Sequence, residues 1–232
     1  MDILPQSSLF LGVIPALIIM YISLKGYEGY YKDKTMFLTF VAGIIMGFIV
    51  AFVQYFTLSL HIIFITILAV ILAFFSQLFK TIVLNLPRFH RKSETPIYGL
   101  SLGLGFGSSF TPSMIIATAA TLTDNVYILT LIIIGSIGII LFHGATGAYI
   151  GFGVFKGKLT RFLIISILLQ IPFNIFLCFM ILYSNINSIH IQIFFVFLLI
   201  VYGFLCFFYI TKKVLPLLIT QTERRKRSKK MT

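Results

Sequence analysis

Seven apolar runs, each close to the length of a membrane-spanning helix, take up most of the 232-residue chain. About 20 mostly apolar residues are needed to cross the roughly 30 Å of hydrocarbon in a bilayer. Backbone groups in lipid need internal hydrogen-bond partners, and the runs lack the alternating pattern of a membrane barrel, so we predict helices. The predicted spans are Ser8–Leu24, Met36–Leu58, Leu60–Leu84, Ile97–Thr121, Val126–Phe155, Phe162–Tyr183 and Ile189–Ile210.

The composition excludes a water-soluble globular domain, because 59% of the residues are hydrophobic and only 10% are charged. We interpret the first run as a retained span, since no basic segment precedes it as in a signal peptide. Cys178 and Cys206 lie in apolar runs, so neither a disulfide framework nor a thiolate metal site is expected. The sequence therefore predicts an all-α membrane protein with a single polytopic domain over residues 1–211 and a basic tail over 212–232.

The basic residues sort onto one side of the predicted membrane domain. The side without Lys or Arg carries Asp2, Asp124, His61 and His190. By the positive-inside rule, we predict an external N-terminus, a cytoplasmic C-terminus and a location in the plasma membrane. The run at 224–230 is expected to contact anionic lipid headgroups rather than nucleic acid. The 18 Lys and Arg that define the basic side are Lys25, Lys32, Lys34, Lys80, Arg88, Arg91, Lys92, Lys156, Lys158, Arg161, Lys212, Lys213, Arg224, Arg225, Lys226, Arg227, Lys229 and Lys230.

Polar side chains within the predicted spans are few, and none is acidic. A proton relay or an ion-coupled transporter usually needs acidic groups at depth, so the sequence disfavours these functions. We expect the polar residues to form one cluster in the membrane half nearer the basic loops, although simple hydrogen bonding between packed helices is an alternative. They are Ser76, Gln77, Lys80, Ser101, Ser108, Ser109, Thr111, His143, Thr146, Gln170 and Asn174.

Glycines recur at steps of four in the fourth and fifth predicted spans. Such spacing lets helix backbones approach closely, but a glycine face can also form a groove for a bound peptide, and both interpretations are open. Pro112 and Pro172 each remove a helix hydrogen bond and predict kinks near the polar cluster. The glycines concerned are Gly99, Gly103, Gly107, Gly147 and Gly151.

Four motifs follow one another between about residues 60 and 184. They read SQLFK at 76–80, IYGLSLGLGFGSSFT at 97–111, LFHGATGAYIGFG at 141–153 and LLQIPFN at 168–174. This order resembles the PrsW-type intramembrane proteases, relatives of the CAAX-processing and abortive-infection membrane proteases. The family pattern is Glu-Glu-x-x-Lys, a glycine-rich helix ending in Glu-Asn, a His-bearing helix followed by glycines, and His-x-x-x-Asn. The resemblance implies a membrane fold built around a metal-assisted peptidase site.

The residues that the family uses for chemistry are mostly replaced in this chain. Lys80, His143 and Asn174 match the family pattern. A metal-assisted peptidase needs several ligands and a carboxylate base, which one histidine cannot supply. The replaced positions are Ser76 and Gln77 for the glutamate pair, Phe110 and Thr111 for Glu-Asn, and Gln170 for the last histidine.

These departures predict a non-catalytic, PrsW-like protein that binds or scaffolds transmembrane segments. Its expected partners are the lipid bilayer and another membrane protein or a transmembrane peptide, and no cofactor is predicted. One alternative is an active intramembrane metalloprotease or hydrolase that uses His143 as a metal ligand or pairs it with Ser108 or Ser109. Another is a lipid- or small-solute-handling membrane protein.

Overall fold

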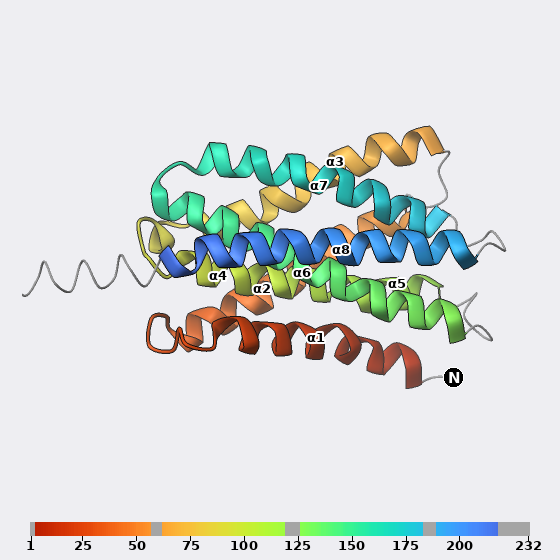
Figure 1. Cartoon of the computed structure of the whole chain (residues 1–232), viewed down its shortest axis with the longest axis horizontal. Coiled ribbons are helices and arrows are strands. Elements are labelled where there is room, and N and C mark those ends of the chain that lie inside the picture. The colour runs from red at the N-terminus through yellow and green to blue at the C-terminus, as the bar shows by residue number, and fades with distance from the viewer. Residues whose placement is uncertain (1–2, 57–61, 119–125, 183–188, 218–232) are drawn as a thin grey trace, which may run out of the picture.

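The computed structural model describes residues 3–56, 62–118, 126–182 and 189–217, and these residues form helices and turns without a strand (Figure 1). Asp2, His61, Asp124 and the basic run at 224–230 lie outside the described residues. The elements in chain order are α1 (Ile3–Leu24), α2 (Asp33–Phe56), α3 (Ile62–Leu84), the short 3-10 helix η1 (Pro87–Phe89), α4 (Thr95–Ser108), α5 (Phe110–Thr118), α6 (Val126–Lys156), α7 (Leu159–Leu182) and α8 (Ile189–Val214).

Five helices in the described residues are long and apolar enough to cross a membrane, which is consistent with an integral membrane protein. A shorter apolar helix, Ser8–Leu24, lies within α1. The five long segments are Asp33–Gln54, Ile67–Leu84, Tyr127–Lys156, Leu159–Phe179 and Ile189–Val214.

The predicted fourth span is divided into two helices. We expected one helix with a kink at Pro112, but α4 ends at Ser108 and α5 begins at Phe110. Pro112 therefore lies in the first turn of α5, where backbone N–H groups have no intrahelical partner and a proline costs little. By contrast, α7 continues through Pro172.

The connections between α1 and α2, between α3 and α4, and between α6 and α7 lie at one end of the bundle, together with the last turn of α8 (left in Figure 1). These segments and the helix turns that flank them carry the described Lys and Arg of the predicted basic side, with the exception of Lys80. Because α8 extends to Val214, Lys212 and Lys213 belong to its last turn rather than to a separate tail. The basic segments thus share one end of the molecule.

α4 is the most enclosed helix, and all 14 of its residues are buried. It packs against α1, α2 and α6. A side chain at Gly43 of α2 would overlap the backbone oxygen of Leu102, and one at Gly103 of α4 would overlap the backbone oxygen of His143. Because only hydrogen fits at these positions, α4 lies in backbone contact with both α2 and α6.

All five predicted glycines take part in the contact between α4 and α6. A side chain at Gly99 would overlap the backbone oxygen of Gly147, and one at Gly107 or Gly151 would approach backbone atoms of the facing helix. Of the two interpretations, the geometry supports helix packing. The space that a bound peptide would need is taken by the neighbouring helix.

Candidate functional site

The side chain of Lys80 lies at the centre of a buried group of polar side chains. Its Nζ is 2.9 Å from Nδ1 of His143, and it donates to Oγ1 of Thr146 at 2.7 Å and to Oε1 of Gln77 at 3.3 Å. Lys80 is 0% exposed. Sequence reasoning counted Lys80 both with the basic side and with the polar residues inside the spans. The three partners hold its side chain inside the protein, as expected for the polar residues.

A series of amide hydrogen bonds continues from Lys80 to α7 and back to α3. Nε2 of Gln77 donates to Oε1 of Gln170 at 2.5 Å, and Nε2 of Gln170 donates to Oδ1 of Asn174 at 2.7 Å. Nδ2 of Asn174 then donates to the backbone oxygen of Ala69 at 2.9 Å. Each amide therefore has a partner on a neighbouring element, and the series ties α3 to α7.

The spacing of these residues along their helices explains why they meet. Side chains three or four residues apart lie on the same face of a helix, so each helix presents one polar strip among apolar residues. All of the residues are at most 5% exposed. Together they form what we term the polar cluster: Gln77 and Lys80 of α3, His143 and Thr146 of α6, and Gln170 and Asn174 of α7.

Aromatic rings enclose His143 on the side of α4 and α5. The ring of Phe110 stacks on the imidazole with centroids 5.3 Å apart and planes at 20°, and the Phe106 ring lies 4.7 Å away. The Phe106 ring also lies 5.0 Å from Nζ of Lys80, a distance at which a ring face attracts a cation. Phe110 stands where the resemblance implies a glutamate base, so a phenyl ring lies against His143 at this point.

The predicted hydroxyl residues lie outside the polar cluster, apart from Thr146. The hydroxyls of Ser108 and Ser109 point to backbone oxygens rather than to His143, so the geometry gives the Ser–His alternative no hydrogen bond. Oγ1 of Thr111 is buried and has no hydrogen-bond partner among the described residues. The serine hydroxyls donate to backbone oxygens as follows: Ser76 to Leu72, Ser101 to Met36, Ser108 to Gly105, and Ser109 to Phe106.

The side chains around His143 fit a hydrogen-bonding role better than a metal site. Catalytic zinc sites use three protein ligands and an open position for water. In the described part of the chain, no three His, Cys, Asp or Glu side chains lie close enough to share an ion. The nearest polar partner of His143 is the amine of Lys80, and amide oxygens such as that of Gln77 are weak ligands for transition metals. This arrangement can hold α3, α6 and α7 together and keep the amine of Lys80 buried inside the helix bundle.

Sequence reasoning missed Phe106 and the glycines of α2. Phe106 and Phe110 are four residues apart, a spacing that places both rings near one helix face. Gly43 and Gly47 repeat the small-residue spacing of the fourth and fifth spans, and a side chain at Gly47 would overlap the backbone oxygen of Phe106. Both spacings can be read from the amino-acid sequence.

The fold and the polar cluster define an all-helical membrane protein with a closed polar interior. Comparison with known proteins gives no match to a family model, a curated protein or a solved structure. The contacts within the chain itself are therefore the basis for its proposed function.

Proposed function

We propose that the chain is a PrsW-like integral membrane protein that binds or scaffolds transmembrane segments without cutting them. One observation carries the proposal: six of the positions equivalent to the family motifs meet in one place, although they come from separate helices. At this place Gln77 and Phe110 stand where the family pattern has glutamates, and Gln170 stands where it has a histidine. The positions that meet are Gln77, Lys80, Phe110, His143, Gln170 and Asn174.

The enclosure of the cluster favours binding over cleavage. Hydrolysis needs a water molecule within reach of a base, and a carboxylate normally fills that role in a metal-assisted peptidase. Phe110 covers one side of His143, and His143 and Lys80 are 1% and 0% exposed. A closed cluster of this kind fixes α3, α6 and α7 relative to one another and supports a rigid surface for a partner helix.

The test uses the full chain in liposomes with a transmembrane peptide that carries a fluorophore, a quencher and a photo-crosslinking group. We expect a crosslinked complex and no rise in fluorescence, both for the wild type and for His143→Ala. Cleavage by the wild type that is lost in His143→Ala would instead support the hydrolase alternative. If the peptide is neither crosslinked nor cleaved, the proposal fails.

We also propose seven spans in the plasma membrane, with the basic end of the bundle in the cytoplasm. The shared position of the basic segments in Figure 1 supports this orientation. A variant without Cys178 and Cys206 can carry a single new cysteine at Ser93, near the basic end, or at the exposed His190, in the first turn of α8 at the opposite end. An impermeant maleimide should label Ser93→Cys only from the cytoplasmic side and His190→Cys only from outside. The reverse pattern would invert the orientation.

A further inference from the structure

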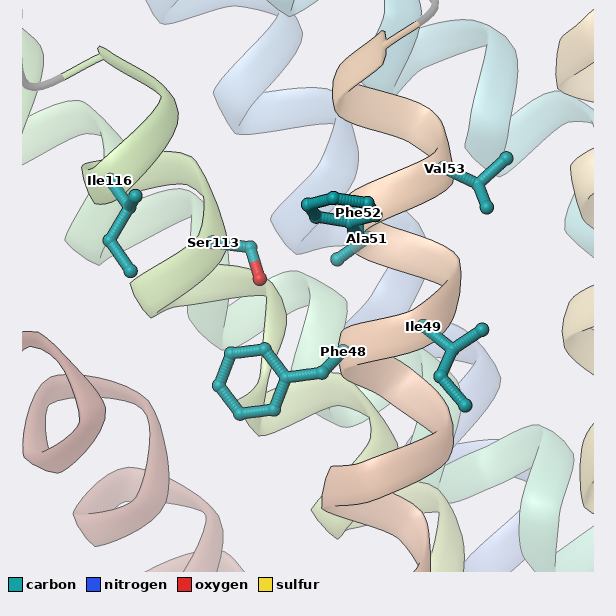
Figure 2. Close-up of a pocket in the computed structure, with 7 residues that line it drawn as sticks. All are labelled: Phe48, Ile49, Ala51, Phe52, Val53, Ser113 and Ile116. Atoms are coloured by element: carbon teal, nitrogen blue, oxygen red, sulfur yellow. The ribbon is translucent and has the colours of Figure 1, made fainter.

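A groove of about 500 Å³ lies between α2 and α5 (Figure 2). Its volume is in the range of about 300–1,000 Å³ that is typical of ligand pockets. The groove is separate from the polar cluster and shares no residue with it. Its lining comes from Phe48, Ile49, Ala51, Phe52 and Val53 of α2 and from Ser113 and Ile116 of α5.

The groove arises where close helix packing stops. Up to Gly47, α2 lies in backbone contact with α4, because Gly43 and Gly47 have no side chain. At the next residue, α2 presents the Phe48 ring, and the break at Ser109 separates α5 from α4. Figure 2 shows Phe48 and Phe52 projecting from α2 into the space beside α5. Bulky rings on one helix and a break in the other therefore leave the space between them.

The lining offers no free polar group to a ligand. The only polar side chain is Ser113, and its hydroxyl donates to the backbone oxygen of Ser109 at 2.8 Å. A polar group buried without a hydrogen-bond partner is costly, so the occupant must be apolar along its whole length. This requirement fits a hydrocarbon chain.

The surroundings of the groove favour an acyl chain over a partner helix. Phe52 and Ile116 are 63% and 56% exposed, and α2 is long and apolar enough to cross a membrane, so in a bilayer the groove would open toward lipid. Helices in membranes usually associate through small residues that let backbones approach, whereas α2 presents Phe48 and Phe52 here. An acyl chain is much thinner than a helix about 10 Å wide and does not require two backbones to approach closely.

We infer that this groove binds one acyl chain of a membrane lipid. Residues 48–53 lie about 20–30 Å along α2 from its start at Asp33, at about 1.5 Å per residue. Because α2 starts at the basic end, the acyl chain enters from the leaflet opposite the basic loops. The groove would be the lipid-binding site of the lipid-handling alternative. The inference does not depend on the proposed binding of transmembrane segments.

The chain contains no tryptophan, so a single introduced tryptophan reports on its own surroundings. Phe48→Trp places the reporter in the groove, and Phe74→Trp places it on α3 at a side chain that is 47% exposed. Each variant is reconstituted with phosphatidylcholine brominated on its acyl chains and is then extracted into unlabelled detergent. Bromine quenches tryptophan at short range, so quenching that survives extraction reports a retained lipid.

We expect Phe48→Trp to stay quenched after extraction and Phe74→Trp to recover fully. Adding Ser113→Phe should fill the groove and abolish the retained quenching. Ser23→Phe is the matched control, because Ser23 is also partly buried and donates to the backbone oxygen four residues earlier, at 2.6 Å. It should leave the retained quenching of Phe48→Trp unchanged.

Full recovery of Phe48→Trp fluorescence would overturn the inference. Native mass spectrometry of the same extracts adds an independent readout, in which we expect a monomer with one bound lipid that is lost in Ser113→Phe. A lipid-free dimer or a lipid-free complex with another protein would overturn the inference, since it would assign the groove to a helix. A folding defect of Ser113→Phe leaves the comparison of Phe48→Trp with Phe74→Trp intact.

Discussion

α6 makes two contacts that depend on opposite properties of its residues. Toward α4 it presents glycines, and the two backbones touch. Toward α3 it presents the polar side chains of His143 and Thr146. His143 belongs to both contacts, because its backbone oxygen faces Gly103 while its Nδ1 lies 2.9 Å from Nζ of Lys80.

The difference shows two ways in which helices associate where the hydrophobic effect contributes little. The glycine contact depends on the absence of side-chain volume and gains dispersion energy from close backbones. The polar cluster depends on matched donors and acceptors, because an unpaired polar group is costly away from water. The first contact should therefore be sensitive to added volume, and the second to lost hydrogen bonds.

The largest expected effect comes from adding one methyl group to the glycine contact. In Gly103→Ala, the new Cβ would overlap the backbone oxygen of His143 and lie 2.9 Å from Cα of Gly144. Backbone atoms cannot move aside without shifting a helix, so we expect a loss of about 3 kcal/mol in the free energy of unfolding. Reversible unfolding of wild type and Gly103→Ala in mixed detergent micelles measures this loss in free energy.

The matched control is Gly144→Ala in the same interface. Its Cβ would meet Cδ2 of Leu104 at 2.7 Å and Cε2 of Phe207 at 3.3 Å, which are ends of side chains that can rotate. We expect a loss below about 1 kcal/mol. Equal losses for the two variants would show that backbone contact is not what limits this interface.

A smaller effect is expected when the polar cluster is interrupted. Gln170→Leu removes the acceptor of Gln77 and the donor to Asn174. The unfolding free energy should fall by about 1–3 kcal/mol, because buried amide groups lose their partners. Ser166→Ala is the control on α7, since its buried hydroxyl has no partner among the described residues. If Ser166→Ala lowered the unfolding free energy as much as Gln170→Leu, the effect would come from altered packing of α7 and not from lost hydrogen bonds.

The smallest effect is the coupling between two amides of the polar cluster. A double-mutant cycle of Gln77→Leu and Gln170→Leu isolates the hydrogen bond between α3 and α7. Such bonds in membrane proteins average about 0.6 kcal/mol and reach about 1.7 kcal/mol, so we expect a coupling energy in this range. Strictly additive losses would mean that the two amides do not stabilise each other.

Much of the fold could be predicted from the sequence, because helix formation in a membrane depends on local properties. The apolar runs agree with the helices of the structure to within a few residues, except where α4 and α5 divide the fourth span. The break at Ser109 was not predicted, because Pro112 is compatible with either a kink or a helix start. The choice between them depends on the helices that pack around α4.

The candidate site could be predicted only in part. The sequence indicated the polar residues of the cluster, including His143, Gln170 and Asn174, but not which of them are bonded. Ser108 and Ser109 were also expected in the cluster, yet their hydroxyls donate to the backbone of their own helix. Which side chains meet depends on how each helix is rotated about its axis, and apolar runs in lipid carry little information about rotation.

By itself, the sequence determined the apolar helices, the collection of basic segments at one end and the small-residue spacing that allows close packing. These features follow from hydrophobic length, charge and side-chain size, which act over a few residues. Only the tertiary structure decided that Lys80 turns inward to His143, 63 residues away, and that α2 and α5 leave a groove. Such outcomes depend on contacts between distant segments, because a buried amine must find its partners wherever the packed helices place them.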